Sequence, residues 1–473
     1  MPTLEDIQKD AYWRKKISNG FVKRVLRNRW FTFSIMIINL VVFLLVIITG
    51  IFGVQTGNQN LSIVFVWILW WFALIAILVP FASRAWCAMC PLPALGEWLQ
   101  RRSIVSAKGK SYGLNKKWPK KLRNLWVVNI FFLGIALFSP FVTTHPIVTG
   151  FLMLSLIIMP LLMHVIFEKR AFCKYVCPVG GFLGLYSNFS CLELRVEDRK
   201  VCYKHKTKEC ILGSSKESPT PGYGCPWFEF PQNMKRNSYC GLCMECIRTC
   251  PKDNTNIYLR PFAVDLVRDT KDKNSSEAWK SLIMLNLAIM YSLVLIGPYG
   301  ILKDWATFAD GVPVFLFYAL IFIGTSVVFI PSLFLLFVLL SRWLAKARDI
   351  AVKKLFIDYS MALVPIGLMG WIAFSFALIQ VNWTYILNVA SDPFGWGWDL
   401  IGTKDVAWAP LVPELLPYIQ TAILMVGVIF SITVANKVSR KHFKEPKKVF
   451  RAQMPIVAFV VIMTMVFLRL YVG

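Results

Sequence analysis

The stretch Cys240–Pro251 reads CGLCMECIRTCP, and it places four cysteines and a closing proline within twelve residues. Its spacing, C-x2-C-x2-C-x3-C-P, is that of a bacterial ferredoxin ligand run. Three thiolates two residues apart can bind three corners of a cubane, whereas the fourth binds a second cluster. A zinc site would more often use separated C-x2-C pairs or histidine. The pattern therefore predicts iron–sulfur chemistry.

A second set of cysteines is expected upstream, because the fourth thiolate of such a run needs partners elsewhere. The candidates follow a stretched spacing, C-x10-C-x7-C-x14-C-P, and they are Cys191, Cys202, Cys210 and Cys225. We predict one [4Fe–4S] cluster on Cys240, Cys243, Cys246 and Cys225. The other would use Cys250 with Cys191, Cys202 and Cys210. The alternative is that one or two of the upstream thiols are simply buried.

The remaining cysteines belong to an internal repeat. RAWCAMCPLPALGEW (84–98) parallels KRAFCKYVCPVGGFLGLY (169–186), and both stretches contain a Cys-Pro pair after an apolar run. We predict that the four thiols meet at the membrane surface and form a metal site, a further cluster or a redox dithiol pair: Cys87, Cys90, Cys173 and Cys177. The alternative is a pair of helix-end turns. Arg84 and Arg170 are expected to lower the thiol pKa.

The rest of the chain is predicted to be a multi-span α-helical membrane protein. Of its 473 residues, 56% are hydrophobic, and several apolar runs reach the roughly 20 residues that cross a bilayer. The first run follows a long leader that carries Glu5, Asp6 and Asp10, which is unlike a cleavable signal. We predict nine spans, of which the third is short: about 30–53, 61–83, 125–142, 147–167, 281–298, 313–340, 355–380, 414–436 and 453–473.

The charge distribution predicts the orientation. With a cytoplasmic N-terminus, the inner segments hold 49 of the 52 Lys and Arg residues, and the outer loops hold only Lys303 and Lys404. This asymmetry follows the positive-inside rule and accounts for the net charge of +26. Nucleic-acid binding is therefore not needed to explain the basic residues. We expect an inner (cell) membrane protein whose N-terminus and iron–sulfur domain are cytoplasmic.

The spans divide the chain into three parts. Residues 1–167 form four spans with the first Cys-Pro motif, and residues 281–473 form five spans without cysteine. Residues 168–280 form an inserted cytoplasmic, ferredoxin-like (α+β) domain with two clusters and the second Cys-Pro motif. Thiols stay reduced in the cytoplasm, which favours metal over disulfides. The Trp-rich outer loop 381–413 predicts an interfacial aromatic belt or, alternatively, a quinone pocket.

Other cofactors are not expected. The four histidines are His145, His164, His205 and His442. The pair nearest the apolar spans, His145 and His164, would lie about 28 Å apart along one helix, so we predict no haem. No nucleotide-binding glycine motif or covalent haem motif occurs. The sequence identifies no catalytic residue.

The motifs CAMCP (87–91), CKYVCPVG (173–180) and CGLCMECIRTCP (240–251) resemble those of the membrane polyferredoxins of the NosR/NapH type, to which the oxidase assembly protein CcoG is related. The resemblance covers residues 61–262. It implies a membrane electron carrier, as a subunit of an oxidoreductase complex, between the quinone pool or a cytoplasmic donor and a partner reductase. The alternative is a copper-handling or maturation factor that uses the twin Cys-Pro motifs. The stretched first cysteine set and the five additional spans depart from the family pattern.

Overall fold

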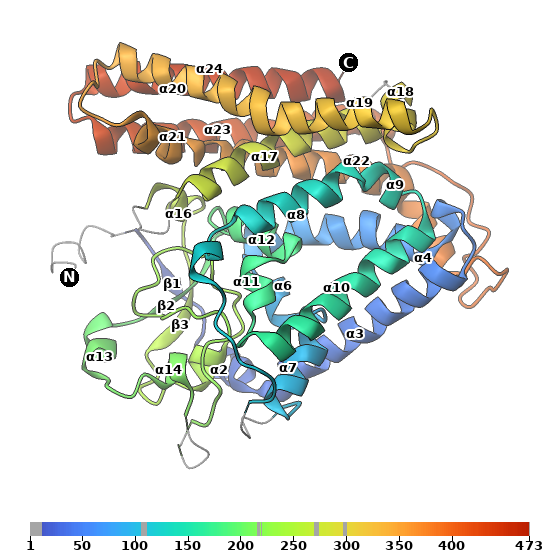
Figure 1. Cartoon of the computed structure of the whole chain (residues 1–473), viewed down its shortest axis with the longest axis horizontal. Coiled ribbons are helices and arrows are strands. Elements are labelled where there is room, and N and C mark those ends of the chain that lie inside the picture. Colours follow the sequence, from blue (N-terminus) through green and yellow to red (C-terminus); the bar gives the residue numbers. More distant parts are fainter. Residues whose placement is uncertain are drawn as a thin grey trace.

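The computed structural model describes residues 12–105, 111–214, 218, 220–268, 274–296 and 300–472. This part of the chain is mostly helical (Figure 1). Eight of its helices are long and apolar enough to cross a membrane, some of them built from two or more consecutive elements. They are α3 (Arg29–Phe52), α4–α5 (Leu61–Ala82), α10 (Pro146–Ile166), α17–η5 (Ser275–Ile296), α19–α20 (Val312–Leu344), α21–α22 (Val352–Ser391), η7–α23 (Pro413–His442) and α24 (Pro446–Tyr471).

The predicted third span is formed by two shorter helices, α8 (Trp126–Leu137) and α9 (Ser139–Val142). The segment formed by α8 and α9 starts at one end of the helical bundle and finishes at the other. The backbone N–H of Leu125 donates to Oγ of Ser276 at the start of α17, 3.2 Å away. Past α9, the N–H of Ile147 donates to Oε1 of Gln55, which follows the last turn of α3. The segment therefore runs the length of the bundle, although α8 alone is shorter than a usual span.

Local sequence explains where several of these helices begin and how closely they pack. The side chain of Asn28 accepts a hydrogen bond from Trp30 N and so caps α3. Helices α3 and α10 lie side by side (Figure 1), and they meet through glycines. A Cβ at Gly50 would lie 3.0 Å from Cα of Gly150, so only small residues allow this approach of the two backbones.

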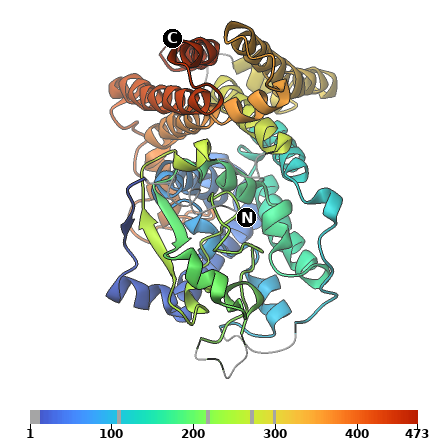
Figure 2. The same ribbon diagram turned by 90° about the vertical axis from the view of Figure 1, so that its left-hand side faces the viewer.

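A small antiparallel sheet stands beside the bundle, with strand order β1-β3-β2 (Figure 2). Strand β2 (Leu192–Val196) pairs with β3 (Thr255–Leu259), and β3 pairs in turn with β1 (Lys15–Lys16). Short helices and long loops surround the sheet. The N-terminal segment thus contributes β1 and α2 (Gly20–Arg27) to the region predicted as residues 168–280. The three-part division of the chain stays a prediction.

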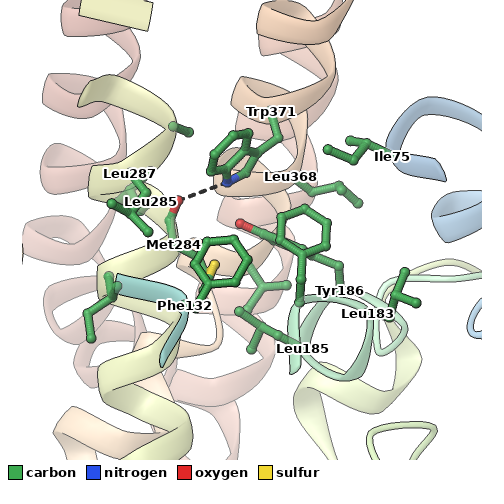
Figure 3. Close-up of a cluster of buried hydrophobic side chains, with 14 of the residues drawn as sticks. Ile75, Phe132, Leu183, Leu185, Tyr186, Met284, Leu285, Leu287, Leu368 and Trp371 are labelled. Atoms are coloured by element: carbon green, nitrogen blue, oxygen red, sulfur yellow. Dashed lines mark hydrogen bonds between the residues drawn. The ribbon is translucent and has the colours of Figure 1, made fainter. Parts of the chain in front are cut away.

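Buried contacts fix this region to the membrane helices. Arg236 makes two hydrogen bonds to the carboxylate of Glu277 on α17, of 2.8 and 2.6 Å, and both side chains are buried. A bidentate pair of this kind is directional as well as strong. Helix α12 (Pro178–Tyr186) packs into the same interior, where Tyr186, Leu285 and Trp371 come together (Figure 3). There Trp371 Nε1 donates to the carbonyl of Met284 at 3.0 Å.

Candidate iron–sulfur centres

The first group of thiols surrounds a cavity of about 320 Å³ beside strand β2. The structure brings together the four cysteines that were predicted to share a cluster, and they are Cys225, Cys240, Cys243 and Cys246. Leu194, Trp227 and Met234 form apolar walls of the same cavity. A closed, apolar setting with four thiols fits a [4Fe–4S] group, whose ligands are cysteine thiolates. We refer to this space as the proximal cavity.

The backbone of the ferredoxin-type loop supports that fit. Leu242 and Met244 have φ angles of 46° and 61°, and residues in this left-handed region turn successive N–H groups toward the inside of a loop. The N–H of Leu242 bonds to the Cys240 thiol and lowers its pKa, and the N–H of Glu245 acts likewise on Cys243. Hydrogen bonds to sulfur are a usual feature of iron–sulfur sites.

Burial changes the acidity of these thiols in the opposite direction. It raises the pKa of Cys225 and Cys243 to about 11 and that of Cys240 to about 12. At neutral pH the free side chains would therefore be protonated and poorly reactive. Binding of a metal releases the proton, because the ligand is the thiolate. The site is thus suited to a permanently bound group more than to thiol redox chemistry.

A second cavity, of about 380 Å³, is lined by three thiols, those of Cys202, Cys210 and Cys250. We call it the distal cavity. Helix α13 (Arg199–Lys204) carries Cys202, and α14 (Glu209–Leu212) carries Cys210. The side-chain amide of Asn254 donates to Sγ of Cys202 at 3.1 Å, and its backbone N–H donates to Sγ of Cys250 at 3.4 Å. Both sulfurs therefore receive hydrogen bonds, as cluster ligands usually do.

The structure places Cys191 away from these three thiols, although the sequence predicted all four as ligands of the second cluster. Its Sγ lies 3.6 Å from the carbonyl oxygen of Phe81, at the end of a membrane helix. Cys191 precedes the end of β2 at which Leu192 pairs with Leu259. The distal cavity lies at the other end of the sheet, because Asn254 directly precedes Thr255, the partner of Val196. The five residue steps from Cys191 to Val196 correspond to roughly 17 Å of strand.

The twin Cys-Pro motifs meet where the membrane helices end. Helix α6 (Ala85–Met89) carries Cys87, α11 (Ala171–Tyr175) carries Cys173, and Cys90 and Cys177 follow these helices. Burial raises the pKa of Cys90, and the nearby thiols of Cys177 and Cys87 raise it further. The N–H of Gly180 donates to Sγ of Cys177 at 3.2 Å. We call this group, which is entirely buried, the twin-motif site.

The predicted effect of the two arginines on these thiols is outweighed by burial. Arg170 lowers the pKa of Cys173, and Arg84 lowers that of Cys177. Desolvation nevertheless dominates, and it raises the pKa of Cys173 strongly and that of Cys177 to about 11. The arginines therefore lower the thiol pKa as expected, but the net shift is upward because burial is the larger cause. The sequence showed the nearby charges but not the complete burial of the sulfurs.

Arg170 also connects the two Cys-Pro motifs through hydrogen bonds. Its Nη1 donates to the carbonyl of Cys87 at 2.7 Å, which joins the two motifs. Its Nη2 donates to the buried carboxylate of Glu97 on α7 (Ala94–Arg101) at 2.6 Å, and Arg101 pairs with the same carboxylate. Buried charges are retained only when paired in this way. The repeat is thus held together by a polar network that the sequence pattern did not reveal.

Direct contacts link the twin-motif site to the proximal cavity. The N–H of Arg170 donates to the carbonyl of Pro226 at 3.1 Å, and Nζ of Lys169 donates to the carbonyl of Cys225 at 3.1 Å. The proximal and distal cavities share one wall residue, Pro231. The three groups of cysteines therefore follow one another from the membrane helices outward.

The thiols of the proximal and distal groups each surround a cavity and do not converge on the position of a single metal ion. Within the described ranges, no three His, Cys, Asp or Glu side chains are close enough together to hold a single metal ion. A cubane separates its ligands by the width of the cluster, so wider spacing of the cysteines suits a multi-atom group.

Comparison with known proteins agrees with iron–sulfur chemistry. A family model described as "4Fe-4S binding domain" matches residues 63–121 and 149–191. The two matched stretches contain the twin Cys-Pro motifs and Cys191, and they end before the run at 240–251. An uncharacterized protein of Methanocaldococcus jannaschii is 29% identical over 193 residues, which cover 38% of this chain and 74% of that protein. No solved structure matches the chain. The chain therefore contains a 4Fe-4S binding domain and, with its eight long apolar helices, is described as an iron–sulfur protein of the membrane.

Proposed function

We propose that this protein relays electrons between a quinone in the membrane and a partner reductase, through [4Fe–4S] clusters held in the proximal and distal cavities. The observation that carries the proposal is the unbroken series of contacts from an apolar cavity among the membrane helices, through the twin-motif site, to both cysteine cavities. A [4Fe–4S] group supplies one-electron transfer when bound. The protein's own residues supply the ligands, the spacing and the exclusion of water.

The apolar cavity lies among the membrane helices, and small-molecule sites are lined predominantly by hydrophobic and aromatic side chains. Leu92, Pro178 and Val179 form the part of its wall that belongs to the Cys-Pro turns. The remaining wall is rich in aromatic rings from both halves of the chain, including Phe43, Trp67, Trp70, Trp71, Phe132, Tyr291 and Phe374. A lipid-soluble ring compound such as a quinone matches these walls in polarity.

Two further features favour a bound ligand there. The indole Nε1 of Trp70 is buried without a hydrogen-bond partner, and a quinone carbonyl could accept its N–H. Trp67 and Trp70 lie in η2 (Val64–Trp70), a π-helical segment, and Leu295 lies in a second one, η5 (Ser292–Ile296). Such segments occur often at functional sites because they displace side chains from the regular helical positions.

Helices from the C-terminal half of the chain contribute to the wall of this cavity. Tyr291 and Leu295 from α17–η5 and Phe374 from α22 (Leu363–Ser391) close one side of the cavity. The Trp-rich outer loop does not line it. There Trp396 and Trp398 are half-exposed and pack on each other, 5.4 Å between ring centres. They suit an aromatic belt at the membrane surface, as the first of the two sequence interpretations expected.

Cluster reduction by a quinol tests the proposal. The protein is purified anaerobically into lipid nanodiscs, a short-chain quinol is added, and the bleaching of visible absorbance is followed together with the EPR signal. In Leu156→Trp the new ring fills the cavity, and we expect reduction by quinol to slow at least tenfold while reduction by dithionite stays unchanged.

The matched control is Leu162→Trp, on the same helix but 58% exposed on the outer face of the bundle. It should behave like the wild type. Reduction of Leu156→Trp at the wild-type rate would exclude this cavity as the quinol site. If quinols never reduce the wild type, the donor is instead a cytoplasmic protein.

A further inference from the structure

We propose that His205 supplies the fourth ligand of the cluster in the distal cavity, in the place that the sequence alone assigned to Cys191. The inference rests on the proposed two-cluster function and deepens it. It starts from the distal cavity, which is lined by three thiols and lacks Cys191. A [4Fe–4S] cluster commonly has four protein ligands, and histidine can take the place of cysteine in iron–sulfur sites.

The spacing along the chain supports this assignment. Cys202 and His205 are separated by two residues, as are Cys240 and Cys243 in the run that lines the proximal cavity. The upstream set then reads C-x2-H-x4-C-x14-C-P. It differs from the downstream run by one histidine and by longer intervals after it. This order needs no ligand from the far end of the sheet.

The position of the imidazole agrees with the spacing. His205 lines the distal cavity together with the three thiols. It follows directly after α13, and its backbone N–H donates to the carbonyl of Cys202 at 3.3 Å. The C-terminal turn of α13 therefore presents Cys202 and His205 to one cavity. Cys210 approaches from α14, and Cys250 from the end of the ferredoxin-type run.

The surroundings of the ring are those of a metal ligand. Nε2 of His205 lies 3.1 Å from Oε2 of Glu209 and 3.0 Å from Oγ1 of Thr207. Both contacts involve the same nitrogen, which leaves Nδ1 to serve as a ligand. A histidine that binds metal usually donates its other N–H to a carboxylate, which fixes the ring and makes it a better ligand. Glu209 occupies that place.

Two other polar side chains in the lining, those of Asn254 and Lys208, have partners of their own. The amide of Asn254 donates to Sγ of Cys202 and, at 2.6 Å, to the carbonyl of Asp198. Nζ of Lys208 lies 5.5 Å from the ring centre of Phe230, where it makes a cation–π contact. Of the described residues around the cavity, His205 is therefore the side chain best placed to complete the three thiols.

A neutral imidazole in place of a thiolate makes the site less negative and raises the reduction potential. The distal cluster would then be the more oxidising of the two, and electrons that enter from the membrane side would collect there. This gives the relay a direction, from the proximal to the distal cavity, that the arrangement of the sites alone does not determine.

The test compares His205→Ala, His205→Cys and Cys191→Ser in the full-length protein purified anaerobically. Iron and labile sulfide are counted, the clusters are titrated by EPR, and nitrogen hyperfine coupling is measured on protein labelled with ¹⁵N-histidine. We expect His205→Ala to lose about four irons per chain or to lose the nitrogen coupling. His205→Cys should keep its iron, lose the coupling and titrate at a lower potential. Cys191→Ser should match the wild type.

The inference is overturned if Cys191→Ser loses iron as Cys202→Ser does, or if His205→Ala keeps both its iron and an unchanged spectrum. Absence of nitrogen coupling in the wild type would also overturn it. These outcomes differ from a failure of the proposed function, in which the wild type itself would contain no iron. Circular dichroism of each variant shows whether a loss of iron reflects misfolding.

Discussion

The guanidinium carbon of Arg84 lies 4.5 Å from the ring centre of Trp227. Arg84 begins the first Cys-Pro turn, where its Nη2 is 3.8 Å from Sγ of Cys87, and Trp227 is a wall of the proximal cavity. Nη1 of Arg84 also donates to the carbonyl of Ser238, which lies next to the ferredoxin-type run. One buried cation therefore contacts two of the three cysteine groups, and it offers a way to test their coupling.

Replacing this cation should change both stability and redox behaviour. Arg84→Leu removes a desolvated cation–π contact, worth about 2 kcal/mol, and a positive charge that favours the reduced cluster. We expect a lower reduction potential for the proximal cluster, measured by EPR titration, and a lower melting temperature. In Arg84→Lys, which keeps the positive charge, the reduction potential of the proximal cluster should stay closer to the wild-type value. Arg102→Leu is the control, because Arg102 stacks on Tyr112 at the surface, and a similar shift there would show that the effect is not local.

The cysteines of the proximal cavity should act as one set. A single replacement by serine should remove the proximal cluster, about four irons per chain, and leave the distal cluster largely intact. This holds for each of Cys225, Cys240, Cys243 and Cys246. Iron and sulfide analysis with EPR measures this. The wild type should hold about eight irons, or about twelve if the twin-motif site also binds a cluster. Zinc in place of iron would contradict the assignment.

The packing at Gly241 predicts a sensitive position. A Cβ on this residue would lie 2.1 Å from Cε2 of Trp227, so Gly241→Ala must displace the indole that walls the cavity. Overpacking costs typically 1–3 kcal/mol, and we expect slower cluster incorporation and faster loss of iron in air. Gly134→Ala is the control, because nothing lies within 4 Å of its added methyl group. Equal iron retention in the two variants would show that Trp227 can move freely.

Asp265 on α16 (Val264–Val267) predicts a pH dependence of stability. Burial alone would raise its pKa, but Arg260, Arg195 and Arg268 outweigh burial and lower the pKa to about 2. A carboxylate with a depressed pKa stabilises the folded state above its unfolded pKa of about 4. This contribution, about 2 kcal/mol, is lost as the pH falls from about 4 to about 2.

The variant Asp265→Asn tests this dependence. At pH 7 it should be less stable by about 3–5 kcal/mol, since it leaves buried arginines without a counter-charge. The difference from the wild type should shrink below pH 4, as measured by chemical denaturation of both proteins after removal of the clusters. A difference that is constant from pH 7 to pH 2.5 would mean that Asp265 carries no charge in the folded protein.

The nine spans predicted from the sequence imply the locations of two reporters. A fusion after Asn274 should lie in the cytoplasm and one after Gly473 on the opposite side, because basic residues are concentrated in alternate segments. Alkaline phosphatase and a fluorescent protein measure the two locations. If both fusions report one side, the short segment of α8 and α9 does not cross the bilayer.

Local spacing in the sequence was enough to predict the chemistry and the main elements. The C-x2-C-x2-C-x3-C-P run needs only a short loop to bring its thiols together, so it pointed correctly to Cys240, Cys243 and Cys246 around one cavity. Apolar runs of bilayer length likewise predicted helices, because a helix satisfies its backbone hydrogen bonds locally. The repeated Cys-Pro stretches were also visible as a pattern.

Only the tertiary structure decided which distant residues complete the sites. Cys191 and Cys202 are close in the chain, but the register of β2 on β3 places them at opposite ends of the sheet. The N-terminal strand β1 joins that sheet across more than 240 residues. Burial outweighs the effect of Arg84 and Arg170 on the thiol pKa, and it comes from segments that are far apart in the sequence. Strand register and desolvation depend on how whole elements pack, and no local spacing records them.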